Sequence, residues 1–217
     1  MKRPHVIINC AMSADGKIAS PTRKQIRISS DEDIKRMHQL RNKCDAVLVG
    51  IGTILADDPK LTVKKKYVKN PKQPLRVILD SKGRTPANAL VLNNTSKTLI
   101  ITAKGKEKTY PGSHIEVVSC KIDKNRLIDV KSVLDLLYRK GVRTLLVEGG
   151  GTIIWNFLKN RVVDDFFIFI GSCIIGGKET PTVADGEGIT SEEDSIPLKI
   201  VKVKRVGLGV LIHYQSR

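Results

Sequence analysis

The sequence has few aromatic residues, only 4% of its 217 residues, so its core must consist mainly of Ile, Val and Leu. It also lacks any run of about 18 apolar residues, the length that a membrane-spanning helix needs. Its cysteines form no C-x-x-C motif, and neither they nor the histidines have the spacing of metal ligands. These absences argue against a membrane span, a disulfide scaffold and a zinc ribbon. They predict a reduced, cytoplasmic protein with no metal and no membrane partner.

Acidic residues are outnumbered by basic ones, 22 against 38, which gives a net charge of +16. Such an excess is typical of proteins that bind nucleic acids, anionic membranes or phosphorylated ligands, but a solvated lysine-rich surface also produces it. The basic residues are spread along the chain, without interleaved aromatic side chains on which bases could stack. The densest basic run, at 64–74, is interpreted as an exposed loop, and we expect no nucleic-acid partner.

Short runs rich in Ile and Val alternate with amphipathic stretches, which is the pattern of an α/β domain. We expect strands at 5–10, 46–50, 75–80, 98–102, 115–118, 143–148 and 166–171. We expect helices at 31–43, 129–141 and about 151–160, and a C-terminal antiparallel hairpin formed by 198–205 and 210–214. Because no long linker divides the chain, the prediction is a single domain over residues 1–217, with a mixed, mostly parallel central sheet flanked by helices.

Three consecutive glycines, Gly149 to Gly151, follow an apolar stretch and precede the helical pattern TIIWNFL. Glycine is costly in backbone entropy, so three in a row indicate a local benefit. Without side chains the backbone can approach a ligand closely, and the N–H groups at the start of a helix attract phosphate. A tight turn between strand and helix is the alternative. Glu148 directly precedes the glycines and is expected at the carboxyl end of the strand, the usual place of an α/β binding site.

The segment GIGT, at 50–53, contains a G-x-G pair that could be mistaken for a dinucleotide fingerprint. Leu55 stands where the third glycine belongs, and no acidic residue ends a strand about 20 positions later. A Rossmann domain is therefore disfavoured. The same segment continues to Asp57 and Asp58 before a proline, which indicates either an ordinary turn or a carboxylate that faces a ligand ribose or a cation.

Two polar loops follow other expected strands. DSKGRTP, at 80–86, places Ser81, Lys82 and Arg84 together, a combination that suits a phosphomonoester such as the 2′-phosphate of a nicotinamide cofactor. A solvated turn is the alternative. MSADGK, at 12–17, contains a common turn sequence and on its own predicts only a turn that carries Lys17.

Six stretches occur in one order over about 170 residues: MSADGK, RISSDEDIKRMHQLR, VGIGTILADDPKLTV, DSKGRTP, VEGGGT and VVDDFFIFIGSCIIGGKETP. In this order and spacing the chain resembles the reductase family of riboflavin biosynthesis, most closely its stand-alone archaeal and fungal form. The bacterial form carries the same reductase behind a zinc deaminase. The H-x-E and P-C-x-x-C motifs of that deaminase are absent, so only the reduction is expected here.

The resemblance implies a dihydrofolate-reductase-like fold, a homodimer, and NADPH as cofactor with NADH as a weaker donor. It implies reduction of the ribosylamino side chain of a pyrimidine 5′-phosphate to ribitylamino. The residues implied to bind the cofactor are Thr53, Asp57, Ser81, Lys82, Gly83, Arg84, Gly149, Gly150, Gly151 and Thr152. The residues implied to bind the substrate are Arg41, Leu61 and Lys64 at its phosphate, and Lys17 and Glu148 at its ribose and pyrimidine.

The catalytic candidates are Asp57, Lys17 and Glu148. A protonated imine is the better acceptor of hydride, so a carboxylate beside it would stabilise the developing cation, and Asp57 is the candidate. Glu148 can accept hydrogen bonds from the pyrimidine. Bacterial relatives tend to have Arg where Lys64 stands, which loses the bidentate fork but keeps the charge.

Two other functions stay open. A reductase of the same fold could act on folate or another pterin, although the phosphate-binding pair of Arg41 and Lys64 argues against it. A nucleic-acid-binding protein would explain the charge of +16, but it leaves the glycines and the order of the motifs unexplained.

Overall fold

The computed structural model describes residues 2–216, and the chain divides into two compact units. Within these residues, one unit consists of 2–5 and 38–146, and the other of 6–37 and 147–216. The helix α1 (Asp31–Lys43) and the strand β6 (Thr144–Gly149) each begin in one unit and end in the other. None of the helices formed by residues 2–216 has the length and apolar character needed to cross a membrane.

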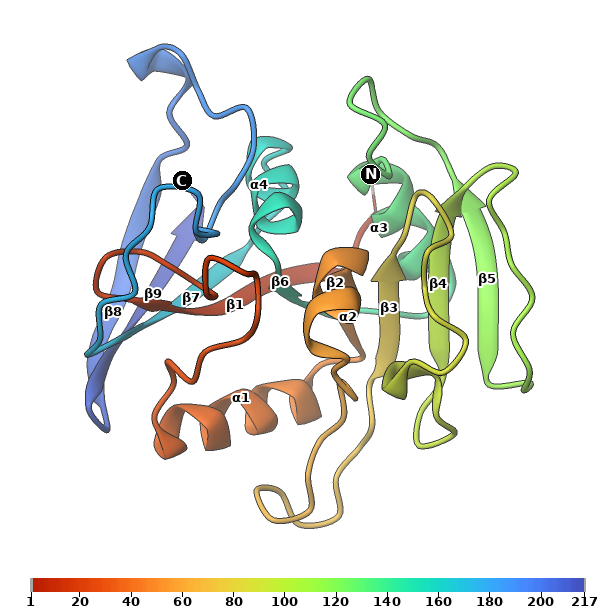
Figure 1. Ribbon diagram of the computed structural model, residues 1–217, viewed down its shortest axis with the longest axis horizontal. Coiled ribbons are helices and arrows are strands. Elements are labelled where there is room, and N and C mark those ends of the chain that lie inside the picture. The colour runs from red at the N-terminus through yellow and green to blue at the C-terminus, as the bar shows by residue number, and fades with distance from the viewer. Residues whose placement is uncertain (1, 217) are drawn as a thin grey trace. The chain divides into compact units, whose positions relative to one another are not determined.

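The first unit contains four parallel strands in the order β5-β4-β3-β2. These are β2 (Ala46–Gly50), β3 (Leu75–Leu79), β4 (Thr98–Ala103) and β5 (Ile115–Cys120). Every residue of β2 is buried, as expected for a strand that is covered on both faces. Figure 1 shows β3, β4 and β5 side by side and pointing the same way, so the loops that follow them leave from one edge.

Helix α3 (Val130–Arg139) forms where the sequence predicted it. Its buried stripe consists of Val130, Val133, Leu134 and Leu137. The Asp129 side chain caps its start by accepting a hydrogen bond from the Ser132 N–H at 2.8 Å. Beyond its end, Gly141 adopts a left-handed backbone with φ of +88°. The prediction of this helix and of its stop signal is confirmed.

The first unit also contains two elements that the sequence did not predict, the helix α2 (Ile51–Asp57) and the 3-10 turn η1 (Leu90–Leu92). Glycine weakens a helix by about 1 kcal/mol relative to alanine, so Gly52 removes the local signal for a helix here. Burial of Ile51 and Ile54, three positions apart on one face, offsets that cost.

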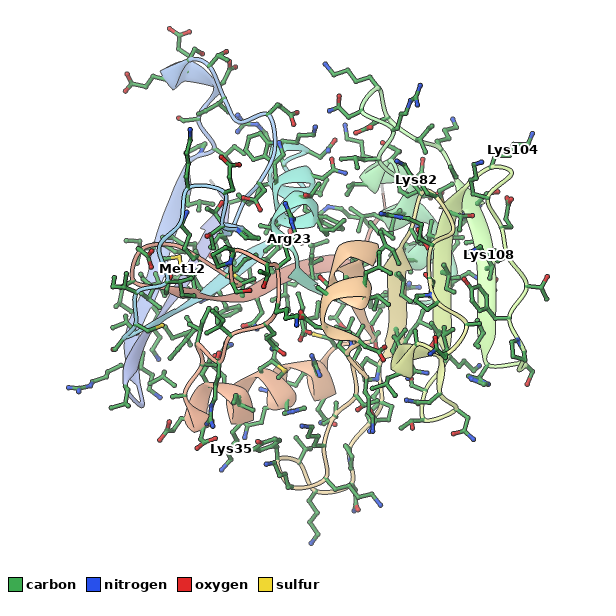
Figure 2. All side chains as sticks on the ribbon, in the orientation of Figure 1. Met12, Arg23, Lys35, Lys82, Lys104 and Lys108 are labelled. Atoms are coloured by element: carbon green, nitrogen blue, oxygen red, sulfur yellow. The ribbon has the colours of Figure 1, made fainter. Side chains whose placement is uncertain are left out.

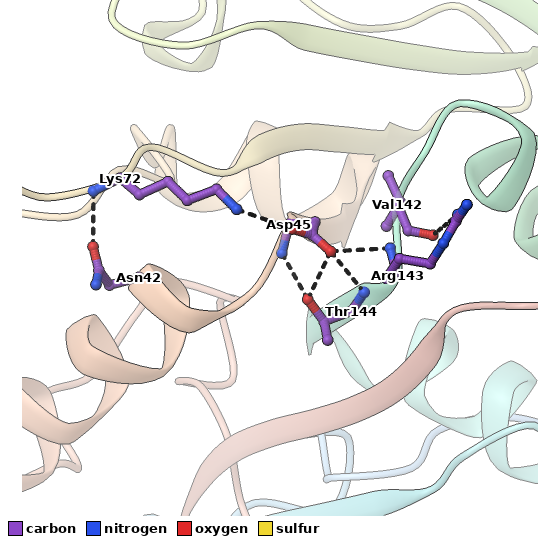
Figure 3. Close-up of polar contacts among 6 residues, drawn as sticks. All are labelled: Asn42, Asp45, Lys72, Val142, Arg143 and Thr144. Atoms are coloured by element: carbon purple, nitrogen blue, oxygen red, sulfur yellow. Dashed lines mark hydrogen bonds and ion pairs between the residues drawn. The ribbon is translucent and has the colours of Figure 1, made fainter.

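Asp45 ties the start of β2 to the start of β6 and to the segment before β3 (Figure 3). Its Oδ2 atom accepts hydrogen bonds from the N–H groups of Arg143 and Thr144 and from the Thr144 hydroxyl, all at 3.0 Å. Lys72 donates to its Oδ1 atom at 2.9 Å. Burial alone would raise the pKa of Asp45, but the hydrogen bonds from Lys72, Arg143 and Thr144 lower it to about 2. This carboxylate braces the amino ends of the strands.

The second unit has a mixed sheet in the order β1-β7-β9-β8. Its strands are β1 (His5–Ser13), β7 (Asp165–Gly171), β8 (Leu198–Val206) and β9 (Gly209–Ser216), and its other elements are α4 (Gly151–Lys159) and η2 (Glu192–Asp194). Strands β1 and β7 are parallel, whereas β9 runs antiparallel to both β7 and β8. The predicted mixed sheet and the C-terminal hairpin are confirmed.

Candidate functional site

Two adjacent carboxylates, Asp57 and Asp58, lie at the end of α2. Asp58 has a left-handed backbone with φ of +41°, and its Oδ1 atom accepts a hydrogen bond from the Leu90 N–H at 2.8 Å. Asp57 is exposed and lies four residues after the half-buried Thr53, so these two side chains share one helix face. The contact to Leu90 gives Asp58 a structural role, and Asp57 stays a predicted ligand residue.

The loop Ser81–Arg84 follows β3 and presents two exposed cations, Lys82 and Arg84. Neither of them forms an ion pair with any residue in the range 2–216. Gly83 has φ of +64°, and a Cβ atom there would lie 2.3 Å from the carbonyl oxygen of Lys106, so only glycine fits. In Figure 2, Lys82 and Lys104 both lie at the end toward which β3 and β4 point, and Lys104 belongs to the loop after β4.

The predicted substrate-phosphate residues Arg41, Leu61 and Lys64 are brought together in the first unit. The Arg41 guanidinium donates to the carbonyl oxygen of Thr62 at 3.0 Å, which places the 61–64 segment against α1. Leu61 is only 3% exposed and has φ of +49°, so its side chain belongs to the core and only its backbone can face a ligand. Lys64 is exposed.

His38 was not predicted as part of this cluster. It is 2% exposed, its Nδ1 atom accepts a hydrogen bond from the Lys64 N–H at 3.4 Å, and its ring stacks on Tyr67 at 4.7 Å between centroids. The sequence offered one weak signal, because His38 lies three residues before Arg41 and therefore on the same helix face.

In the second unit, the three glycines connect β6 to α4, and the structure gives a reason for glycine at two of them. Gly149 has φ of +111°, which L side chains rarely adopt, and the peptide bond that follows it is cis. A Cβ atom on Gly151 would lie 2.5 Å from the Thr182 carbonyl oxygen and 2.6 Å from Asp185 Oδ2. Gly150 precedes α4, whose first turn has no side-chain cap and no acidic residue. The backbone N–H groups in the first turn of α4 form the positive end of its helix dipole.

The Asp185 carboxylate beside the third glycine was not predicted from the sequence. Its Oδ1 atom accepts hydrogen bonds from the N–H and the hydroxyl of Thr182, at 3.0 and 2.6 Å. This contact holds the 182–185 segment in place next to Gly151. Packing against this segment therefore accounts for the glycine at 151, and the positive φ of Gly149 fits the alternative of a tight turn.

Lys17 and Glu148 also belong to the second unit, and both are half-buried. The MSADGK segment forms the predicted turn, with the Ser13 N–H donating to the carbonyl oxygen of Lys17 at 2.8 Å. The Lys17 ammonium group lies 3.5 Å from the Thr180 carbonyl oxygen. Asp15 accepts from Ser13 and from the Ile175 and Gly176 N–H groups, which lowers its pKa to about 2. The turn is thereby tied to the 175–182 segment.

Residues 4–212 match the family described as the RibD C-terminal domain. The chain is 39% identical over 217 residues to the 2,5-diamino-6-ribosylamino-4(3H)-pyrimidinone 5′-phosphate reductase of Archaeoglobus fulgidus, with 97% of each chain covered. Its fold is similar to the crystal structure of a Thermotoga maritima deaminase and reductase, with a TM-score of 0.83 and 30% identity. That match covers 99% of this chain and 57% of the larger bifunctional one.

The fold is also similar to that of dihydrofolate reductase from Enterococcus faecalis. The TM-score is 0.53 and the identity 10%, with 98% of this chain and 96% of the other covered. At this identity the likeness concerns the fold alone. The prediction of a dihydrofolate-reductase-like α/β fold is confirmed.

Proposed function

The chain belongs to the RibD C-terminal domain family, and we propose that it catalyses the NADPH-dependent reduction of a 6-ribosylaminopyrimidinone 5′-phosphate to its ribitylamino product. The full-length match to an archaeal enzyme named for this substrate carries the proposal. The predictions of a reductase, of riboflavin biosynthesis and of the stand-alone archaeal form are confirmed by the same match. The chain is an oxidoreductase of that pathway.

Each unit has one feature that suits a part of a dinucleotide cofactor with an extra phosphate. The start of α4 offers backbone N–H groups beside a residue without a side chain, Gly150, which suits a pyrophosphate. The Ser81–Arg84 loop offers two cations without acidic partners, which suits a 2′-phosphate. When bound, the cofactor supplies the hydride that reduces C1′ of the opened ribosylamine.

The protein's own residues would orient the substrate and stabilise charge. Arg41 and Lys64 would hold the 5′-phosphate, and Lys17 and Glu148 would contact the ribose and the pyrimidine. Asp57 ends α2, where the helix dipole is negative, so its carboxylate and the helix end would together favour a cation that develops on the substrate's imine. The single-domain organisation over 1–217 and the cytoplasmic location also remain proposals.

The reaction is tested by following nicotinamide absorbance with NADPH and the ribosylaminopyrimidinone phosphate as substrate. We expect oxidation of NADPH with this substrate and none with dihydrofolate, since a pterin has no phosphate for Arg41 and Lys64. A gel-shift assay with DNA at about 150 mM salt tests the nucleic-acid alternative, and we expect no shift. Turnover of dihydrofolate alone would replace this proposal with the pterin reductase.

The preference for NADPH is expected to depend on Arg84. One charged hydrogen bond contributes about 1.5–3 kcal/mol, so Arg84→Ala is expected to weaken NADPH binding roughly 10- to 100-fold. NADH binding should hardly change, because NADH has no 2′-phosphate. Dissociation constants of both cofactors, measured by fluorescence titration, check this, and equal losses for the two would contradict the assignment.

We also propose a homodimer, with the apolar face of the β8–β9 hairpin as the contact between copies. Ile200 and Val203 are each 58% exposed. The strand register pairs them with Tyr214 and Ile212, so they share one face of the sheet. Exposed apolar side chains in one row are typical of an interface rather than of a solvated edge.

Val203→Asp is expected to convert the dimer to a monomer at micromolar concentration, because it places a charge within an apolar contact. Sedimentation velocity measures the change. Lys204→Asp, on the opposite face of the same strand, is the matched control and should leave the dimer intact. Dimers in both variants would show that copies associate through another surface.

A further inference from the structure

Asp80 lies at the base of the Ser81–Arg84 loop and is fully buried, with 0% of its surface exposed. Its Oδ2 atom accepts two hydrogen bonds from Thr85, one from the N–H at 2.7 Å and one from the hydroxyl at 2.8 Å. Because Asp80 and Thr85 flank the loop on either side, this contact closes it. Inside the loop, the Gly83 N–H donates to the carbonyl oxygen of Asp80 at 3.1 Å.

Tyr110 braces the same base from a separate segment. Its hydroxyl donates to the carbonyl oxygen of Thr85 at 2.8 Å. Burial, and then the negative charge of Asp80, raise the pKa of Tyr110, so the phenol stays a hydrogen-bond donor. The middle of the loop is held as well, because Gly83 packs against the backbone of Lys106. The loop therefore has its shape before any ligand arrives.

Stability alone does not explain a carboxylate in this position. Burying a carboxylate costs free energy, and hydrogen bonds offset that cost fully only when both oxygens are satisfied. The Oδ1 atom of Asp80 has no hydrogen-bond partner among residues 2–216. An apolar side chain could fill the same space. It could not accept the hydrogen bond from the Thr85 N–H, which holds the backbone next to Arg84 in place.

We propose that Asp80 is a positioning residue that, with Thr85 and Tyr110, holds the Ser81–Arg84 loop in the conformation that recognises the 2′-phosphate of NADPH. This rests on the proposed function, since it concerns the same phosphate subsite. The side chains of Lys82 and Arg84 are long and lose entropy on binding, so their affinity for phosphate depends on a firmly held backbone. NADH gains nothing from a rigid loop. Asp80 thus contributes to the choice between the two cofactors without touching either.

The experiment compares dissociation constants of NADPH and NADH for the wild type, Asp80→Ala, Arg84→Ala and Asp45→Ala. Asp45 is the matched control, because it also accepts from the N–H and the hydroxyl of one threonine, Thr144, but at the amino ends of the strands. We expect Asp80→Ala to weaken NADPH binding about 10-fold and NADH binding less than about twofold. Asp45→Ala should lower the melting temperature and leave the ratio of the two constants at the wild-type value.

Tyr110→Phe provides a second test that does not depend on the folding of Asp80→Ala. It removes one hydroxyl and is expected to weaken NADPH binding about threefold, with NADH unaffected. If Arg84→Ala lowers the preference for NADPH and neither Asp80→Ala nor Tyr110→Phe does, the positioning role is overturned and the cofactor assignment stands. If Arg84→Ala leaves the preference unchanged, the loop is not the phosphate site and both proposals fall.

Discussion

A Gly150→Val protein is expected to lose at least about 100-fold in affinity for NADPH, because a β-branched side chain would occupy the place where a pyrophosphate meets bare backbone. Two or more charged hydrogen bonds to N–H groups would be lost together, which is why the effect should exceed that of Arg84→Ala. Fluorescence titration measures the dissociation constant of NADPH. The constant of Gly150→Ala is expected to lie between those of the wild type and Gly150→Val.

The structure shows why Gly150 is the informative position of the three. A side chain on Gly149 would be strained by its positive φ, and one on Gly151 would collide with Thr182 and Asp185. Gly150 has φ of −66°, which L residues adopt readily, so this torsion does not strain a side chain there. Circular dichroism should therefore show a folded protein. Normal NADPH binding by the Val variant would mean that the glycine run is only a turn.

The elements of this fold were largely predictable because they depend on local patterns. Helix α1 was predicted with the bounds it has, since Ser30 and the acidic residues after it mark a helix start. Helix α2 was missed because its reason to be helical, the burial of Ile51 and Ile54, is tertiary. Helix propensity depends on local sequence alone, and the glycines lower it here.

The motifs of the sequence named the candidate site residues but could not give their environments. The motif gave Asp57 and Asp58 side by side, and the structural role of Asp58 depends on its contact to Leu90, 32 residues away. The burial of Leu61 and the contact between Gly151 and Asp185 likewise depend on packing between segments distant in sequence. Such packing leaves no local pattern, so the sequence could not indicate it.

The reduction itself is expected to depend most on Asp57. Asp57→Asn is expected to lower kcat about 100-fold, on the scale of removing one electrostatic stabiliser, because the carboxylate opposes positive charge that grows on the substrate's imine. Asparagine keeps the shape and one hydrogen-bonding oxygen, so cofactor affinity should change little. Lys64→Ala, in contrast, should mainly raise KM and leave kcat nearly unchanged. The reason is that a phosphate contact remote from the hydride transfer contributes to substrate binding.

Asp58→Asn is the matched control for Asp57→Asn, since it removes the same charge one residue further along. Asp58 accepts a hydrogen bond from the Leu90 N–H through its Oδ1 atom. Asparagine keeps an oxygen at that position, so the variant should stay folded with kcat near the wild-type value. A general effect of charge at the end of α2 would instead lower kcat in both variants. Single-turnover rates at saturating NADPH separate the chemical step from binding and product release. An Asp57→Asn enzyme with an unchanged single-turnover rate would remove Asp57 from the chemistry, because a group that stabilises the developing cation has to act in that step.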